Sequence, residues 1–258
     1  MVKIAVCLYG QPRNYSEGCK NIKKFVENHD VDFYYHTWIL NSNDSYYKHS
    51  KQRHVNMEEL KGDKDIITKL NLLYNPKAHI FEESKSSYFD IQTKEQIRSS
   101  IAYSNTPNYH NEEFRISNYL SQLYSRQQVR NLLYNIIQTE KIEYDFVIMI
   151  RFDFLNKINV NIDLNNINKQ LIYVSDMHKP SKLFADGIFL LNVDNFFKMF
   201  NIYDNLDNLI NNKTLDTLCS SYNVVLALPP EHLIFANYLY YFNDIKNLEY
   251  VTFPKFHF

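Results

Sequence analysis

The clearest indication of the fold is the sequence YDFVIMIRFD at residues 144–153. Its first seven residues are almost continuously apolar. This is typical of a strand covered on both faces, as in a parallel sheet flanked by helices. The apolar run ends abruptly in two opposite charges, Arg151 and Asp153. Because a charge is costly to bury unless it is paired or bound to a ligand, we expect both side chains at the rim of the sheet, facing a cleft.

The N-terminal part of the chain has a β-α-β pattern. Residues 3–9 form a short apolar run that ends in a loop at Gly10-Gln11-Pro12-Arg13. Residues 16–28 have the spacing of an amphipathic helix, and residues 31–36 read as the next strand. This order favours a parallel sheet that binds ligands at the carboxyl ends of its strands.

The rest of the chain continues to alternate helix-like and strand-like patterns. Residues 83–111 show no sustained period, and so long an irregular stretch inside a domain favours a functional lid. We find no internal repeat and no Gly/Ser/Pro-rich hinge, so we predict a single α/β domain over residues 1–258, with a mixed, mostly parallel central sheet flanked by helices. The further helices expected are 56–74, about 116–137, 195–209 and 229–242, and the further strands are 78–82, 170–175, 187–191 and 248–253.

Composition excludes several classes of function. The formal net charge of -1 provides no basic field for a polyanion, so we expect no nucleic-acid partner. No apolar stretch reaches the ~20 residues that span a bilayer, and the first residues do not resemble a signal peptide. The three cysteines, Cys7, Cys19 and Cys219, read as buried free thiols of a reducing compartment. We therefore expect a cytoplasmic protein.

Arg151 and Asp153 suggest a phosphate site with a metal. A carboxylate at the rim suits Mn²⁺ or Mg²⁺, hard cations that take oxygen ligands and share them with substrate phosphates. The planar guanidinium of Arg151 suits the same phosphates. An Arg–Asp pair that simply ends the strand is the alternative.

Gly10 and Arg13 come directly after the first predicted strand. A glycine lets the backbone approach a ligand closely, and an arginine three residues later can reach a phosphate. The loop matches neither the G-x-G-x-x-G fingerprint nor a P-loop, and an ordinary turn is the alternative.

His36, Trp38 and Gln122 are weaker candidates. His36 and Trp38 end the second strand, where a tryptophan can line a base or a sugar. A satisfied buried histidine and a packing tryptophan are the alternatives. Gln122 lies in a run of polar side chains on the long helix, which a solvated helix face explains equally well.

Together these motifs resemble a group of GT-A-type glycosyltransferases found in large DNA viruses and bacteria. The resemblance implies a Rossmann-like nucleotide-diphosphosugar fold in which the first strand and its loop hold the nucleotide. It also implies that Asp153 matches the last carboxylate of an Asp-x-Asp metal motif. Arg151 stands where the first acid is typical, which weakens the case for tight metal binding, and an arginine can partly replace the cation at the leaving diphosphate. The matching segments are 9–13, 34–38, 121–125 and 144–153, with weaker matches at 186–187 and 230–233.

The resemblance and the residues together predict a glycosyltransferase with a UDP-sugar donor and a glycan or other hydroxyl acceptor. Residues 1–155 form the nucleotide-binding half and residues 156–258 the acceptor half. The expected donor site contains Gly10, Arg13, His36, Trp38, Gln122 and Arg151, with Mn²⁺ or Mg²⁺ on Asp153. One alternative is a non-catalytic module that binds a nucleotide sugar or glycan. Another is a sugar-1-phosphate nucleotidyltransferase, for which the first loop is too poor in glycine.

A transferase that inverts its sugar also needs a general base near the acceptor hydroxyl. Asp186 and Glu231 are the candidates, and Asp186 is preferred because it precedes Gly187 and an apolar run. The alternatives are a turn-forming role for Asp186 and a favourable helix-dipole position for Glu231.

Overall fold

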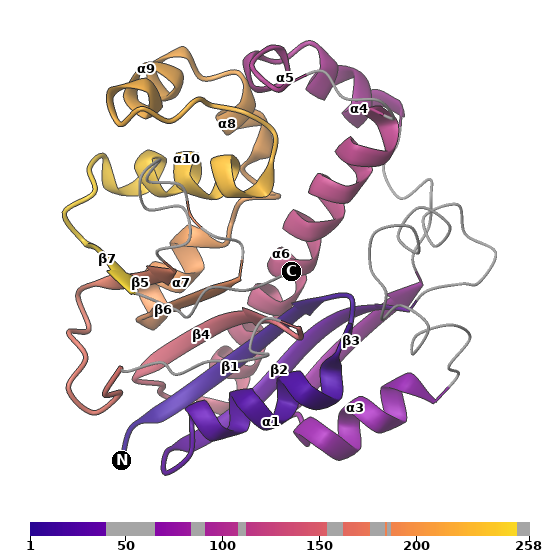
Figure 1. Ribbon diagram of the computed structural model, residues 1–258, viewed down its shortest axis with the longest axis vertical. Coiled ribbons are helices and arrows are strands. Elements are labelled where there is room, and N and C mark those ends of the chain that lie inside the picture. The colour runs from indigo at the N-terminus through magenta and orange to yellow at the C-terminus, as the bar shows by residue number, and fades with distance from the viewer. Residues whose placement is uncertain are drawn as a thin grey trace.

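The computed structural model describes residues 1–39, 65–83, 91–107, 112–153, 162–175, 184 and 187–251; at 91–93 and 112–114 the description covers the backbone alone. Within these residues the strands form one seven-stranded sheet in the order β3-β2-β1-β4-β6-β5-β7 (Figure 1). The strands are β1 (Lys3–Gly10), β2 (Asp30–Ile39), β3 (Ala78–Glu83), β4 (Phe146–Arg151), β5 (Ile172–Ser175), β6 (Ile188–Leu191) and β7 (Leu248–Val251).

Most strand pairs in the sheet are parallel. The neighbouring pairs β3–β2, β2–β1 and β1–β4 all run in the same direction, so these four strands end at one edge. β6 runs antiparallel to both β4 and β5, and β5 pairs with β7 in parallel. The predicted mixed, mostly parallel α/β sheet is confirmed.

Helices cover the sheet on both faces, as the apolar strands require. Ile4, Val6 and Leu8 of β1 belong to the core beneath α1 (Tyr15–Phe25) and α3 (Ile66–Tyr74). The intervening residues of β1 point to the opposite core, because side chains alternate along a strand. That second, larger core lies beneath α6 (Glu112–Glu140), α7 (Val193–Met199), α8 (Leu206–Ile210), α9 (Lys213–Ser221) and α10 (Pro230–Phe242).

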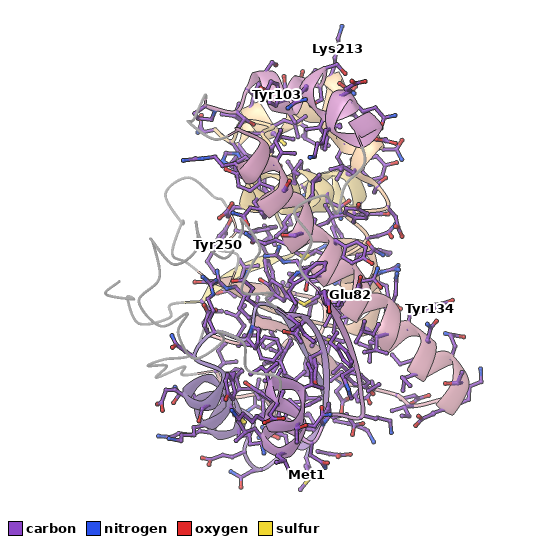
Figure 2. The ribbon with its side chains drawn as sticks, turned by 90° about the vertical axis from the view of Figure 1, so that its right-hand side faces the viewer. Met1, Glu82, Tyr103, Tyr134, Lys213 and Tyr250 are labelled. Atoms are coloured by element: carbon purple, nitrogen blue, oxygen red, sulfur yellow. The ribbon has the colours of Figure 1, made fainter. Side chains whose placement is uncertain are left out.

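α6 is the long amphipathic helix that the sequence predicts, and it runs along most of the molecule (Figure 2). It packs against β1, β2 and β3, so its middle turns lie beside the edge where these strands end. A helix in this position is able to contribute side chains to a site at that edge.

The single helix predicted over residues 195–209 is wrong, because this stretch forms α7 and α8. α7 begins earlier than expected because the side chain of Asn192 accepts a hydrogen bond from the Asn195 N–H at 2.8 Å. The break precedes α8, where the buried Asn205 donates its side-chain amide to Asn237 Oδ1 at 3.1 Å. Asparagine favours such local polar contacts over the helix interior.

The irregular stretch expected over residues 83–111 is also wrong where the structure describes it. It contains α4 (Ile91–Arg98) and α5 (Ile101–Ser104), which bring Ile97 and Ala102 into the larger core. Helices of eight and four residues are shorter than the window in which helical periodicity is recognisable. Residues 84–90 and 108–111 lie outside the described residues, as do 56–64 of the predicted helix before Tyr74 and 252–253 of the last strand.

Candidate functional site

The candidate residues of the nucleotide-binding half gather at the edge where the parallel strands end. In the register of the sheet, Tyr9 of β1 lies opposite His36 of β2 on one side and Arg151 of β4 on the other. Gly10 is the last residue of β1 and Arg13 lies in the loop after it, while Asp153 follows β4. Three separate sequence motifs therefore meet at one edge of the sheet.

Asp153 binds two arginines, and we call these residues the Arg13–Asp153–Arg151 cluster. The Arg151 guanidinium donates to both carboxylate oxygens, from Nε to Oδ1 at 2.9 Å and from Nη2 to Oδ2 at 2.8 Å. Arg13 Nε lies 3.3 Å from the same Oδ2. Burial by itself raises the pKa of Asp153, but the positive charges of Arg151 and Arg13 outweigh it, so the pKa lies below its ordinary value. The cluster carries one net positive charge.

The residues around Asp153 do not fit a cation site. Both of its oxygens already accept from or face guanidinium groups. In the part of the chain that the structure describes, no three His, Cys, Asp or Glu side chains come together as metal ligands would. The described residues therefore give no support to the prediction of Mn²⁺ or Mg²⁺ at Asp153.

Close packing of α1 fixes the backbone between Arg151, the last residue of β4, and Asp153, which follows it. A Cβ at Gly18 would lie 1.8 Å from the carbonyl oxygen of Phe152, so only glycine fits there. The ring of Phe152 is fully buried and packs edge-on against Tyr35 and Tyr74. Arg151 and Asp153 thus flank a residue that has little freedom to move.

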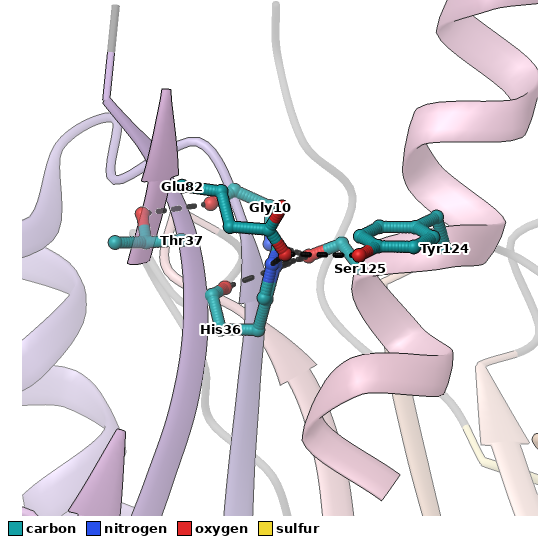
Figure 3. Close-up of polar contacts among 6 residues, drawn as sticks. All are labelled: Gly10, His36, Thr37, Glu82, Tyr124 and Ser125. Atoms are coloured by element: carbon teal, nitrogen blue, oxygen red, sulfur yellow. Dashed lines mark hydrogen bonds and ion pairs between the residues drawn. The ribbon is translucent and has the colours of Figure 1, made fainter. Parts of the chain in front are cut away.

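Gly10 is held in place from two sides, as Figure 3 shows. Its N–H donates to Ser125 Oγ of α6 at 2.8 Å, and its carbonyl accepts from Thr37 Oγ1 at 2.9 Å. Its φ of 89° is one that residues with side chains rarely adopt, and among the described residues, its two chain neighbours apart, no atom lies within 4 Å of the position of a Cβ. The approach of a ligand to this backbone stays a prediction.

His36 lies behind Gly10 and has no exposed surface. Its Nδ1 is 2.8 Å from Ser125 Oγ and its Nε2 is 3.1 Å from Glu82 Oε1, which also accepts from Tyr124 Oη at 3.0 Å (Figure 3). Burial lowers the pKa of His36, although Glu82 acts in the opposite direction. In the neutral form, Nε2–H donates to Glu82 and Nδ1 accepts from Ser125. The alternative of a satisfied buried histidine describes His36, because both ring nitrogens have partners and none of its surface is exposed.

Trp38 and Gln122 differ in what they offer to a ligand. Trp38 is 6% exposed and stacks on Tyr124 with ring centroids 5.6 Å apart, so the packing alternative describes it. Gln122 lies one helical turn before Ser125, on the same face of α6. Its Oε1 is buried and has no hydrogen-bond partner among the described residues, as expected of an atom that a ligand or water satisfies.

The two candidate bases are less well defined. Glu231 lies in the first turn of α10, after Pro230, where the helix dipole favours an acid. Asp186 lies outside the described residues. The next residue, Gly187, accepts a hydrogen bond from the Arg151 N–H at 3.2 Å, so the chain that follows Asp186 runs beside the cluster. Both residues stay predictions as bases.

Sequence reasoning missed two residues that build this edge. Glu82 is the first charged residue at the end of β3, which is the signal that identified Arg151 at the end of β4. Gly18 is a glycine inside a helix, which costs stability and therefore indicates close packing. Both signals are present in the sequence.

Comparison with known proteins gives structural neighbours alone. No family model and no curated protein matches the chain. Among solved structures, the chain is similar to the glycosyltransferase GlyE of Streptococcus pneumoniae TIGR4, with 11% identity and a TM-score of 0.35, covering 96% of this chain and 45% of that one. It is also similar to an active-site mutant of LgtC, with 11% identity and a TM-score of 0.34, covering 91% of this chain and 69% of that one.

A further neighbour is galactosyltransferase LgtC in complex with donor and acceptor sugar analogues, with 12% identity and a TM-score of 0.31, again covering 91% of this chain and 69% of that one. The chain thus spans less than half of GlyE. All three neighbours are glycosyltransferases, and TM-scores this low carry no argument about the site. Within the described residues, no helix is long and apolar enough to cross a membrane.

Proposed function

We propose that the protein is a GT-A-type glycosyltransferase that moves a sugar from a nucleotide-sugar donor, with UDP-sugars the first to test, to a hydroxyl of a glycan or other acceptor. One observation carries the proposal. Two guanidinium groups, Arg13 after β1 and Arg151 at the end of β4, meet at a common carboxylate beside the open backbone of Gly10. The departing nucleoside diphosphate accumulates negative charge, which such a site stabilises.

The position of the cluster supports this function independently of the motifs. β1 and β4 are neighbours, and the chain leaves β1 toward β2 on one side and leaves β4 toward β5 on the other. In open α/β sheets, ligands bind outside the carboxyl ends of the strands at such a switch point. Gly10 ends β1, Arg13 lies in the loop after β1, and Arg151 ends β4, and these are the two strands that flank the switch point.

The remaining site residues have proposed roles in the donor and acceptor halves of one domain over 1–258. Gln122 offers a buried acceptor atom to the donor from the same face of α6 as Ser125. On the acceptor side, the base is Asp186, with Glu231 as the alternative base or an acceptor-binding group. The metal expected on Asp153 is the least supported part, because both carboxylate oxygens are engaged by arginines.

A screen of nucleotide sugars for thermal stabilisation tests the proposal. A ligand whose free concentration is about 100 times its Kd stabilises the native state by about 2.7 kcal/mol. We expect at least one nucleotide sugar to raise the unfolding temperature of the wild type and to have a smaller effect on Arg151→Gln. If none of a panel of uridine, guanosine, cytidine and thymidine sugars raises it, with or without Mn²⁺, the proposed donor site is wrong.

A non-catalytic binding module remains the second candidate, because Arg151 stands where the resembled enzymes have an acid. Such a module passes the stabilisation screen but releases no nucleoside diphosphate. Donor hydrolysis in a single turnover therefore separates the two functions.

A further inference from the structure

We propose that Asp153 is a positioning residue that holds Arg13 and Arg151 as a direct, cation-independent binding site for a diphosphate. This inference rests on the proposed function and specifies how the donor is held. It replaces the role that the sequence motif suggests for Asp153, which is that of a metal ligand.

Asp153 holds both arginines through its two carboxylate oxygens. A carboxylate that binds a guanidinium through both oxygens fixes the plane and direction of that group. Arg151 is held in this way by Nε and Nη2, at 2.9 and 2.8 Å. Arg13 comes from the loop after β1, and its Nε lies 3.3 Å from Oδ2 of the same carboxylate. Asp153 thereby gathers two positive groups from β1 and β4 that otherwise repel each other.

The charges of the cluster favour an anion over a cation. A divalent cation at Asp153 competes with the guanidinium groups for the carboxylate oxygens and lies beside two positive side chains. A diphosphate is attracted instead, because the three side chains of the cluster sum to one positive charge. Guanidinium groups also match the geometry of phosphate oxygens. The side chains of Arg13 and Arg151 are 19% and 26% exposed, so the site is accessible to an anion.

The residue between Arg151 and Asp153 is closely packed. Gly18 of α1 contacts the carbonyl of Phe152, and the Phe152 ring is fully buried. The residues on either side of Phe152 are therefore fixed before a ligand arrives, which reduces the cost of ordering the site on binding.

Calorimetric titration of the full chain with UDP, GDP and inorganic pyrophosphate, each in EDTA and in Mn²⁺, tests the inference. Pyrophosphate is included because it binds regardless of which base the site prefers. We expect affinities in the two conditions to agree within about threefold. Arg151→Gln and Arg13→Gln should each lose about tenfold or more in EDTA, as expected for a charge-assisted hydrogen bond. Lys20→Gln, which removes an exposed positive charge from α1, should bind as the wild type does.

Asp153→Glu tests positioning separately, because it keeps the charge but displaces the carboxylate. It should weaken pyrophosphate binding in EDTA while circular dichroism shows an intact fold. A purely structural role would lower stability without changing this affinity, and that result would overturn the assignment.

Two other results would contradict the inference in distinguishable ways. Binding that is at least tenfold tighter in Mn²⁺, with the increment lost in Asp153→Glu, would restore Asp153 as a metal ligand and leave the proposed function in place. Absence of binding by all three probes in both conditions would remove the donor site and the proposed function together.

Discussion

Gly18 on α1 lies against the carbonyl of Phe152 so closely that a Cβ would come within 1.8 Å of the oxygen. The contact joins the first helix to the short segment that carries Arg151 and Asp153. It explains why a glycine occupies a helix interior, where alanine is intrinsically favoured by about 1 kcal/mol. The geometry of the charged cluster thus depends on a residue with no polar side chain.

Gly18→Ala should therefore destabilise the protein, against the usual effect of this substitution in a helix. We expect a loss of about 1–3 kcal/mol in the free energy of unfolding, the usual range for overpacking, together with weaker pyrophosphate binding. Urea unfolding measures the first and calorimetry the second. Ser16→Ala, on the exposed side of the same helix, is the control. A Gly18→Ala protein that is more stable than the wild type would show that α1 moves away without cost.

Ser125→Ala should loosen the loop after β1. The Ser125 hydroxyl contacts both the Gly10 N–H and His36 Nδ1, and its loss leaves buried polar groups without this partner. We expect about 1–3 kcal/mol of destabilisation and reduced donor affinity. Ser121→Ala is a matched control on α6, because the Ser121 hydroxyl donates to a carbonyl of its own helix. Equal stability of the two variants would contradict the anchoring role.

Stability should fall in mild acid because of His36. Its pKa in the folded protein lies below the ordinary 6.5, so the unfolded chain takes up a proton first as the pH decreases. The stabilisation is complete above pH 6.5 and is lost as the pH falls below it, by up to about 1.4 kcal/mol per pH unit.

Urea midpoints between pH 7.5 and 5, interpreted with this linkage, measure the slope. His36→Gln should be less stable than the wild type at neutral pH but should have a smaller slope. Burial also lowers the pKa of His79, so the double variant His36→Gln/His79→Gln should have a still smaller slope of stability against pH. A slope unchanged by His36→Gln would assign the effect to other groups.

Asp186→Asn should lower turnover by ~10² or more with donor affinity nearly unchanged, as expected for the loss of a general base. The matched comparison is Glu231→Gln, which should retain more activity. Steady-state kinetics with a responsive acceptor separates turnover from donor KM. Normal turnover by Asp186→Asn together with a large loss in Glu231→Gln would transfer the role to Glu231.

The sequence predicts those parts of the molecule whose residues form long runs of one period. The strand 144–150 and the helix over 116–137 are continuous enough to be recognised, and the charges that end β4 mark the edge of the sheet. The short helices α4 and α5 escape recognition because they span too few turns.

The site is only partly predictable for a different reason. Sequence position indicates that Arg13, Arg151 and Asp153 reach the same edge, since parallel strands end together. It raises the Arg151–Asp153 pair only as an alternative, and it does not indicate that Arg13 joins the same carboxylate. Nor does it reveal that His36 faces inward, because alternation along a strand buried on both faces leaves the direction of each side chain undetermined.

The most direct test of the account is the release of free nucleoside diphosphate from nucleotide sugars, followed by chromatography. We expect the wild type to release it from at least one donor, and Arg151→Gln to do so about 10²-fold more slowly, because charge stabilisation at the leaving group is worth that much. Donors that bind to the wild type but release nothing, with or without an acceptor, would contradict the account and identify the protein as a binding module.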